Sequence, residues 1–552
     1  MSFLRVEVIF FLLIALCNVS AKAPSLFSRD LAVDGVNATI TPLSLSSDKQ
    51  SYYFLLKTGE IPFRVALDTG SSDLWLTTSD CRTEACKKSP HYPLSYQDPT
   101  FVAVNSNTTA FKASYGDGTV ASGFVAKETV NIGNMTVPNQ VLGLVTDSNV
   151  TFADSINGIL GLGFPRLSSI NRNTTDSSPF LATLAERGLV RYPLFGVGLT
   201  RGSYGTLALG AIDGTVVKNL SNVEWGEVVQ FPPIGNENNQ TSYWHWALPL
   251  QSVSVNGSPL TLSPSYPNMT GGLPIGLFDV GTSGIYGPWS DVAKLYSGIS
   301  EARLVDESGQ WAVPCDTQAV LSFKFGSRNF TLQPADYLIG PTSGNPKLCL
   351  SWPRANIPTP DGIDWVLGSP FLRTVYTIFS YGIDTKESPM IGLYALNTTN
   401  MTASISSFFS SASATVATIL PNSLLNTPSA TTAPYGLNSS FTAPTGGVVA
   451  SGLANSTYSP ILGQEPTNIS ALPIITASPT VETFTLTDAT GGLTTTTSRH
   501  PVASVVLGVP PGWSENGALS SLRALKDGSF KLLPIVIMSW TTIYTLSDIV
   551  FS

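Results

Sequence analysis

The stretch Leu67-Asp68-Thr69-Gly70-Ser71-Ser72 decides the fold, because Phe278-Asp279-Val280-Gly281-Thr282-Ser283 repeats its pattern in the second half of the chain. In both stretches an Asp ends an apolar run, a Gly stands two residues later and a hydroxyl residue three later. A second pair of signals, Ile159-Leu160-Gly161 and Val366-Leu367-Gly368, follows the two Asp residues at nearly the same spacing. Matching marks in the same order predict a duplicated β-rich unit, with one carboxylate in each of two lobes.

Asp68 and Asp279 have the chemistry of a paired acid and base. Two carboxylates in one low-dielectric site repel each other when both are charged, so one of them keeps its proton under mildly acidic conditions. The ionised partner can take a proton from a bound water while the other donates a hydrogen bond to a carbonyl oxygen. The pair therefore predicts hydrolysis by an activated water, without a covalent intermediate.

The residues that follow each Asp suit the support of such a pair. Gly70 and Gly281 allow a tight backbone turn that presents the carboxylate. Ser71 and Thr282 can each donate a hydrogen bond to the outer oxygen of the neighbouring Asp. We therefore expect both loops to hold their carboxylates in fixed rotamers.

Six motifs extend this pattern in a fixed order over roughly residues 40–396. They are ALDTGSSDLW at 66–75, KASYGDGTVASG at 112–123, GILGLGFP at 158–165, YWHWALPLQSVSVNG at 243–257, FDVGTSGIYGP at 278–288 and WVLGSPFLR at 365–373. On these motifs the chain resembles the pepsin-type aspartic proteases, and within them the fungal yapsin-like proteins with a glycosylphosphatidylinositol (GPI) anchor. The resemblance implies an all-β, bilobal fold with the active-site cleft between the lobes, and an aspartic endopeptidase that uses Asp68 and Asp279. It also implies protein or peptide substrates, a monomer, no cofactor and no metal.

Tyr115-Gly116-Asp117-Gly118 is a turn between two strand-like runs. The resemblance implies that it is the tip of a flap that closes over substrate, with Tyr115 hydrogen-bonded by the indole nitrogen of Trp75. The alternatives are a plain surface hairpin for the turn and core packing for Trp75. The resemblance also implies acceptance of Lys before the scissile bond, as in fungal relatives with an acidic residue at the place of Asp117, because a carboxylate can pair with an ammonium group.

Val280 departs from the family pattern, in which Thr usually stands at this place. The middle Thr of each loop is expected to reach across the lobe interface, so Thr69 keeps its hydroxyl and Val280 has none. Val280 therefore leaves two further hypotheses open: a catalytically weak homologue that binds peptides or wall components, or a structural cell-wall glycoprotein.

Four of the five cysteines lie beyond the leader, and sequence alone allows three ways of pairing them. The resemblance implies the pairs Cys81–Cys86 and Cys315–Cys349. The three histidines are scattered without the spacing of a zinc site, so no metal is expected. In the oxidising compartment expected of a secreted protein, disulfides are favoured over metal ligands.

The composition of the 552 residues favours a secreted protein. The formal net charge is −8 and the pI about 5.0, with no concentrated basic patch for nucleic acid. Sequons such as Asn107, Asn149 and Asn329 indicate a glycoprotein.

The chain divides by composition and motif into six parts. They are a signal peptide at 1–21, a short pro-segment with the first strand at 22–50, an N-terminal lobe at 51–215, a C-terminal lobe at 216–398, a disordered, glycosylated Ser/Thr-rich stalk at 399–515 and a GPI-attachment signal at 516–552. The last part predicts a protein anchored to the plasma membrane or cell wall. A plain secreted protein and a single membrane span are the alternatives.

Local patterns predict individual elements within the two lobes. Thr39 to Leu45 reads as the first strand, and 180–188 and 290–299 read as short helices. The stretch 211–242 is rich in Asn, Gly and Pro and is expected to be a linker.

Overall fold

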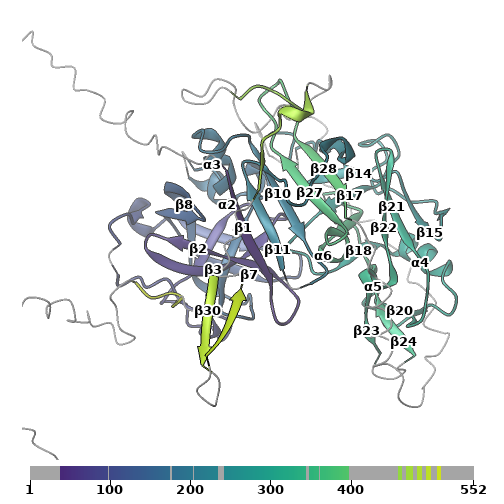
Figure 1. Cartoon of the computed structure of the whole chain (residues 1–552), viewed down its shortest axis with the longest axis horizontal. Coiled ribbons are helices and arrows are strands. Elements are labelled where there is room, and N and C mark those ends of the chain that lie inside the picture. The colour runs from purple at the N-terminus through teal and green to yellow at the C-terminus, as the bar shows by residue number, and fades with distance from the viewer. Residues whose placement is uncertain are drawn as a thin grey trace, which may run out of the picture.

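A computed structural model describes residues 38–396, apart from 97, 175–176, 203, 234–240, 343–346 and 360, and then 458–462, 468–476, 482–487, 493–498 and 506–510. The predicted signal peptide, the anchor signal and most of the predicted stalk lie outside these residues. Strands dominate, and they gather into two lobes (Figure 1). The all-β, bilobal fold class is confirmed.

The first lobe carries most of the N-terminal strands. Its elements are β1 (Thr39–Leu45), β2 (Tyr52–Thr58), β3 (Ile61–Asp68), β4 (Leu74–Thr77), β5 (Val102–Ala103), β6 (Ala110–Ser114), β7 (Val120–Ile132), β8 (Met135–Ser148), β9 (Ile156–Gly161), α2 (Ser169–Asn173), α3 (Phe180–Glu186), β10 (Leu194–Leu199), β11 (Tyr204–Leu209) and β12 (Ile212–Asp213). In β2, buried residues alternate with more exposed ones, which is the pattern of a strand with one face on the core.

The second lobe repeats this mixture of short strands and helices. Its elements are β13 (Glu224–Glu227), β14 (Ala247–Pro249), β15 (Ser252–Val255), β16 (Ser258–Pro259), β17 (Ile275–Phe278), β18 (Ile285–Pro288), α4 (Trp289–Ser297), β19 (Arg303–Leu304), β20 (Trp311–Pro314), β21 (Leu321–Phe325), β22 (Arg328–Leu332), α5 (Pro334–Tyr337), β23 (Leu338–Pro341), β24 (Leu348–Ser351), β25 (Arg354–Asn356), β26 (Trp365–Leu367), α6 (Ser369–Leu372), β27 (Val375–Ser380) and β28 (Met390–Ala395). The first strand and both predicted helices are present at the expected places.

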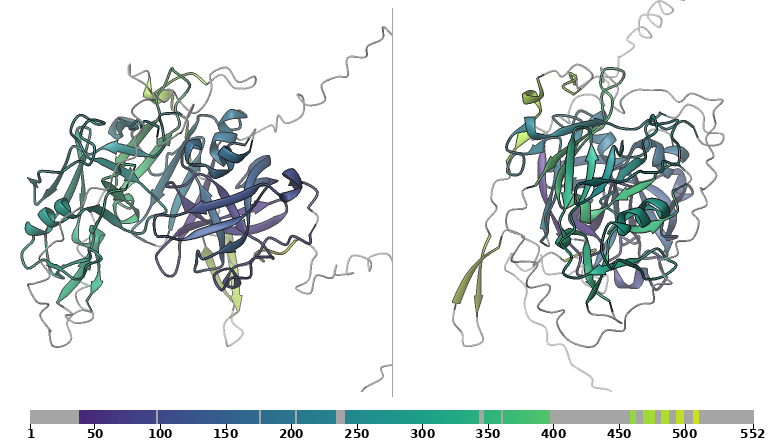
Figure 2. Two further views of the ribbon diagram at one scale, coloured as in Figure 1. Left: turned by 180° about the vertical axis from the view of Figure 1, so that it is seen from behind. Right: turned by 90° about the vertical axis from the view of Figure 1, so that its right-hand side faces the viewer.

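One sheet runs through both lobes. Its order is β13-β28-β27-β10-β11-β1-β2-β3-β9-β4-β8-β7-β5, so strands of the second lobe join those of the first where β27 pairs with β10 (Figure 2). β13 lies in the stretch that reads as a linker, yet it pairs with β28. The reason is local packing, because the ring of Trp225 lies against Gly392, where a side chain would collide with it.

The predicted duplication is visible in the strand pairing. In the first lobe β3 is parallel to β9, and β9 is antiparallel to β4. In the second lobe β17 is parallel to β26, and β26 is antiparallel to β18. Asp68 ends β3 and Asp279 directly follows β17, so the same local topology places both residues.

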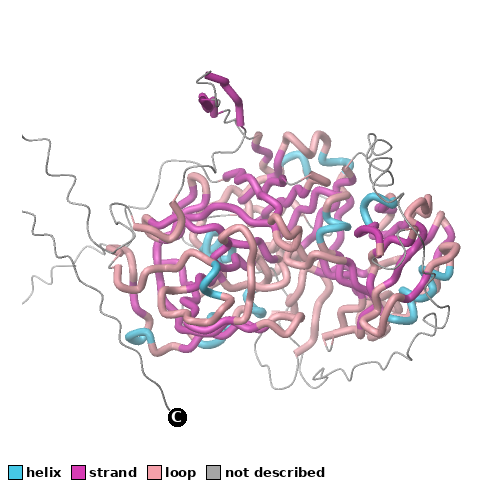
Figure 3. The backbone as a smooth tube through the Cα atoms, turned by 90° about the horizontal axis from the view of Figure 1, so that it is seen from below, coloured by secondary structure: helices cyan, strands magenta, loops and turns pink. Residues whose placement is uncertain are grey.

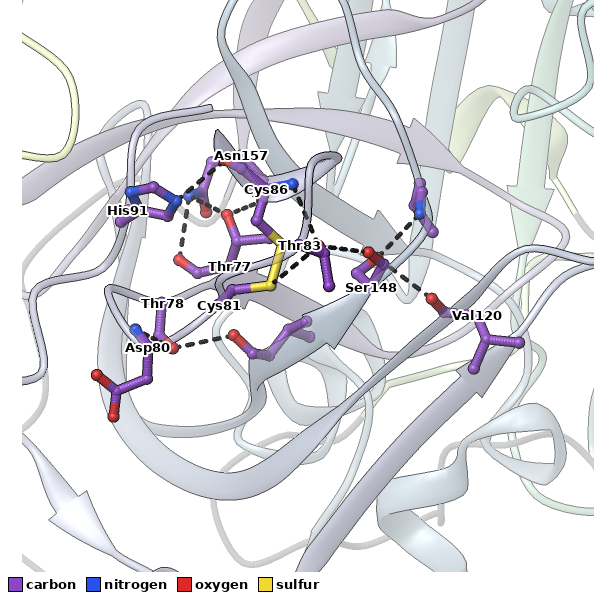
Figure 4. Close-up of a disulfide and its surroundings, with 12 residues drawn as sticks. Thr77, Thr78, Asp80, Cys81, Thr83, Cys86, His91, Val120, Ser148 and Asn157 are labelled. Atoms are coloured by element: carbon purple, nitrogen blue, oxygen red, sulfur yellow. Dashed lines mark hydrogen bonds between the residues drawn. A yellow bond between two sulfur atoms is a disulfide. The ribbon is translucent and has the colours of Figure 1, made fainter. Parts of the chain in front are cut away.

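Both predicted disulfides are present, Cys81–Cys86 and Cys315–Cys349. Beside the first, the Thr83 hydroxyl donates a 2.6 Å hydrogen bond to the Ser148 carbonyl (Figure 4). This disulfide loop is therefore held against the end of β8.

Part of the chain beyond the second lobe, where a stalk was predicted, packs on the catalytic body. β29 (Ile474–Ile475) pairs with β12, while β30 (Glu482–Thr487) and β31 (Leu493–Ser498) form a hairpin that projects from the body (Figure 3). Although this region is rich in Ser and Thr on average, several large apolar residues at 458–462 and 468–476 pack against the body. No helix within the described parts of the chain is long and apolar enough to cross a membrane.

Candidate active site

The two Asp loops meet where the lobes join. The backbone N–H of Leu162, just after β9, donates a 2.7 Å hydrogen bond to the Asp68 carbonyl, and the N–H of Asp279 donates one of 3.2 Å to the carbonyl of Leu367 in β26. Both Asp residues are buried, with exposed fractions of 6% and 9%. The parallel strand of each lobe thus fixes the loop that presents the carboxylate.

Each carboxylate lies against the glycine of the opposite loop. A Cβ atom on Gly70 would stand 2.9 Å from Asp279 Oδ2, and one on Gly281 would collide with the Asp68 carboxylate. Neither glycine has a positive φ, so the backbone conformation alone does not require glycine at either place. Glycine is required here because the two loops approach so closely.

The side chains predicted to support the dyad do contact it. Ser71 Oγ donates to Asp68 Oδ2, and Thr282 Oγ1 donates to Asp279 Oδ2 over 2.6 Å. The backbone N–H groups of Gly70 and Gly281 each donate to the inner oxygen of the neighbouring Asp over 2.9 Å. These bonds hold the inner oxygens of the two carboxylates in matching positions.

Burial, and after it the charge of Asp279, raise the pKa of Asp68 to about 7. Hydrogen bonds from Ser71 and Gly70 act in the opposite sense but do not cancel this effect. The pair therefore retains a proton well above the pH at which an isolated Asp ionises. Such a pair can supply both an acid and a base at mildly acidic pH.

Thr69 connects the two loops. Its hydroxyl donates a 2.9 Å hydrogen bond to the Phe278 carbonyl and accepts one of 2.9 Å from the Val280 N–H. Val280 is buried, and its side chain has no hydroxyl that could form a matching hydrogen bond. The side-chain hydrogen bonds between the two loops therefore come from Thr69 of the first loop, and Val280 of the second loop adds none.

The flap tip lies over the first Asp loop. Trp75 Nε1 donates a 2.7 Å hydrogen bond to the hydroxyl of Tyr115. Burial and the nearby Asp68 raise the pKa of Tyr115, so its hydroxyl stays protonated and can donate. Trp75 is itself buried beneath the flap, which means that it serves both hydrogen bonding and packing.

Asp117 is exposed at this tip, next to Gly116. Its Oδ1 accepts hydrogen bonds from the N–H and hydroxyl of Thr119, at 2.9 Å and 2.7 Å, which fixes the turn. Burial raises the pKa of Tyr286 in β18, while the charge of Arg354 lowers it and the charge of Asp117 raises it. Tyr286 lies within the 278–288 motif, although the sequence did not single it out.

A cluster of aromatic residues supports the first loop from below. The Trp246 indole donates a 2.8 Å hydrogen bond to the Leu162 carbonyl, and the Tyr381 hydroxyl contacts the carbonyls of Leu162 and Gly163 at 2.9 Å and 2.8 Å. The Phe164 ring lies 4.2 Å from that of Trp246. Only the position of Trp246 within the 243–257 motif could have pointed to this contact.

Within the described residues, no group of three or more His, Cys, Asp or Glu could hold a metal ion. The chemistry available at the cleft is that of the two carboxylates, the Tyr115 hydroxyl and a water molecule. This set of groups suits peptide hydrolysis by general acid and base catalysis.

Comparison with known proteins agrees with this site. The family model for eukaryotic aspartyl proteases matches residues 51–388, which include both Asp loops. The chain belongs to this family. It is similar to an aspartic protease of Phaffia rhodozyma, at 29% identity over 327 residues that cover 58% of the chain and 71% of the relative.

Two other relatives show the same extent of similarity. Cathepsin D of Gallus gallus is 31% identical over 349 residues, covering 60% of the chain and 79% of the relative. Major aspartyl peptidase 1 of Cryptococcus neoformans is 26% identical over 328 residues, covering 58% of the chain and 64% of the relative. The chain is accordingly an aspartic-type endopeptidase, and its substrates are proteins or peptides.

Proposed function

We propose that the protein hydrolyses peptide bonds with a water activated by Asp68 and Asp279, at mildly acidic pH and outside the cell or at its surface. The single observation that carries the mechanism is the approach of each carboxylate to the glycine of the opposite loop. The raised pKa of Asp68 supports it, because the pair must hold one proton to work.

The reaction uses that shared proton. The ionised carboxylate takes a proton from the water, whose oxygen attacks the peptide carbonyl carbon. The protonated carboxylate gives its proton to the carbonyl oxygen, and a tetrahedral intermediate forms. The carboxylate that took the proton of the water then gives it to the leaving nitrogen as the C–N bond breaks. An O–H of the intermediate returns a proton to the other carboxylate as the product acid forms, so the pair again holds one proton.

Turnover of a peptide library by the purified protein between pH 3 and 7, with and without pepstatin, tests this mechanism. We expect pepstatin-sensitive cleavage that Asp68→Asn abolishes and that Asp316→Asn, at an exposed acid of the second lobe, leaves unchanged. Activity that survives Asp68→Asn would overturn the mechanism.

Val280 supports a second candidate, a homologue that binds peptides without turning them over. A silent parent protein that gains activity as Val280→Thr would favour this candidate. Activity in the parent would reject it.

For location, the two disulfides support an oxidising compartment. The proposed GPI anchor rests on the sequence of 516–552, which lies outside the described residues. A phospholipase specific for that anchor should release the protein from cells. Protein that stays on the membrane after this treatment would contradict the anchor.

A further inference from the structure

Two short segments beyond the second lobe return to the catalytic body. We define residues 458–462 and 468–476 as the clasp segment. Its Leu462 and Leu472 are each only 3% exposed. They pack on apolar residues of the body: Tyr192, Ile212, Val217, Tyr376, Ile378 and Ile383. In Figure 1 the clasp segment is the yellow-green chain that crosses the strands of the body near β28.

A buried carboxylate receives the start of the clasp segment. Glu387, 1% exposed, accepts hydrogen bonds at Oε2 from the backbone N–H groups of Ile461 at 2.8 Å and Leu462 at 2.7 Å. The Tyr192 hydroxyl donates to the same oxygen over 2.6 Å. A buried carboxylate is costly unless its oxygens are hydrogen-bonded, so these peptide N–H groups complete the site.

The second half of the clasp segment adds a strand. The Ile212 N–H donates a 2.9 Å hydrogen bond to the Pro473 carbonyl, and the Gly214 N–H donates one of 2.8 Å to the Ile475 carbonyl. A Cβ atom on Gly214 would stand 2.5 Å from Ile474 Cγ2. Glycine at 214 therefore leaves room for the clasp segment.

These contacts involve both lobes. The Tyr458 hydroxyl donates a 2.9 Å hydrogen bond to the carbonyl of Val190, and β29 pairs with β12, both in the first lobe. Glu387 lies between β27 and β28 of the second lobe. The clasp segment thus bridges the lobes through main-chain hydrogen bonds and apolar packing together.

We propose that the catalytic body carries a peptide-binding site whose ligand is the chain's own clasp segment, and that this segment holds the two lobes together. Residues 397–457 then connect two points of one body. Because Gly508 also contacts the body through Pro62, any tether toward a surface anchor starts after residue 508 instead of after the last strand of the second lobe.

The test uses the full chain as the Asp68→Asn variant, so that its result does not depend on catalysis. Sequences for a site-specific protease are inserted between 420 and 440 and between 499 and 505. The second cut separates the excised piece from Gly508, whose N–H donates to the Pro62 carbonyl. After cleavage, size-exclusion chromatography measures how much of the piece stays with the body.

We expect the piece to co-elute with the body and to be displaced by a synthetic peptide of residues 456–478. Leu462→Asp and Gly214→Ala should each weaken retention at least tenfold, since one places a charge in the apolar site and the other removes the space at Ile474. Ser459→Asp places the same charge on an exposed residue of the clasp segment and should retain the piece.

Prompt loss of the piece from the unsubstituted body would overturn the proposal, as would equal retention by all three variants. If Leu462→Asp fails to fold, Gly214→Ala and peptide displacement still decide the outcome. Release of the piece should also lower the midpoint of thermal unfolding. An unchanged midpoint would refute the clasping of the lobes.

Discussion

The Thr69 hydroxyl accepts a 2.9 Å hydrogen bond from the backbone N–H of Val280 and so joins the first Asp loop to the second. The same hydroxyl donates to the Phe278 carbonyl. Val280 is only 1% exposed and has nearly the shape of Thr. It lacks the hydroxyl that could form the matching hydrogen bond from the second loop to the first. Thr69 therefore supplies side-chain hydrogen bonds that join the two loops, and Val280 supplies none in return.

Val280→Thr should strengthen the site. The substitution adds a hydroxyl at the residue whose backbone N–H already bonds Thr69, and one net hydrogen bond contributes about 1 kcal/mol. We expect the free energy of unfolding to rise by about that amount, and kcat to rise several-fold because the loops are held in register. Chemical denaturation and peptide turnover measure the two effects.

Val253 in β15 provides the matched control, because it is fully buried but lies outside both Asp loops. Val253→Thr should lower the free energy of unfolding, because it buries a hydroxyl away from the loop contact that Thr69 makes. An equal loss of stability in both variants would show that Val280 is ordinary core.

The stability of the fold should depend on pH through Asp68. Its pKa is about 7 in the folded protein, whereas an Asp in an unfolded chain titrates near ~4. The folded state therefore holds a proton that the unfolded chain releases, and folding is penalised progressively as pH rises between these values.

Asp68→Asn removes this penalty. Relative to the parent protein, the variant should gain unfolding free energy as pH rises from about 4 to 7, with little difference at the acidic end. Thermal unfolding at several pH values measures this gain. Asp316→Asn, at an exposed acid, should show no such trend. If the difference in unfolding free energy between Asp68→Asn and the parent protein also stays constant with pH, the pKa of Asp68 is not raised in the folded protein.

The loops around Asp68 and Asp279 were predictable because a site of this chemistry needs fixed residue types at short spacings. The contacts of Trp246 and Tyr381 with the Leu162 carbonyl were not, since residues far apart in sequence leave no local pattern. The close approach that requires Gly70 was likewise hidden, because the sequence shows the glycine but not what stands opposite.

The clasp segment was missed for a different reason. Average composition over a Ser/Thr-rich region predicts disorder, and Leu462 and Leu472 are too few to change that average. Their partner Glu387 lies near the end of the last predicted lobe, where it looks like one more charged turn residue. Only the fold brings the buried carboxylate and the apolar surface together.

Trp75→Phe tests whether the flap is held by its hydrogen bond or only by packing. The substitution keeps a buried ring but removes the N–H that donates to Tyr115 over 2.7 Å. Loss of this hydrogen bond should weaken the stabilisation of the flap over the site by about 1 kcal/mol. We therefore expect kcat/KM to fall by roughly fivefold to tenfold.

Trp311→Phe is the control for loss of a buried indole. Trp311 stacks on Tyr296, with ring centroids 4.7 Å apart, and its indole nitrogen has no hydrogen-bond partner among the described residues. This variant should change stability but leave kcat/KM intact. A similar fall in kcat/KM for both variants would assign the Trp75 effect to packing.

Asp117→Asn should reduce any preference for Lys over Leu before the scissile bond. The carboxylate is exposed at the flap tip, so an ammonium group bound beside the tip would lie in its field. Asn keeps an oxygen that can accept the turn hydrogen bonds from Thr119, which separates charge from structure. Paired peptides that differ only at Lys or Leu measure the preference as a ratio of kcat/KM values.

We expect this ratio to fall by up to about tenfold at low salt and by less at high salt, because exposed charges are screened. Asp147→Asn removes an exposed charge of the same lobe outside the flap and should leave the ratio unchanged. An unchanged ratio in Asp117→Asn would mean that the flap carboxylate serves only its own turn.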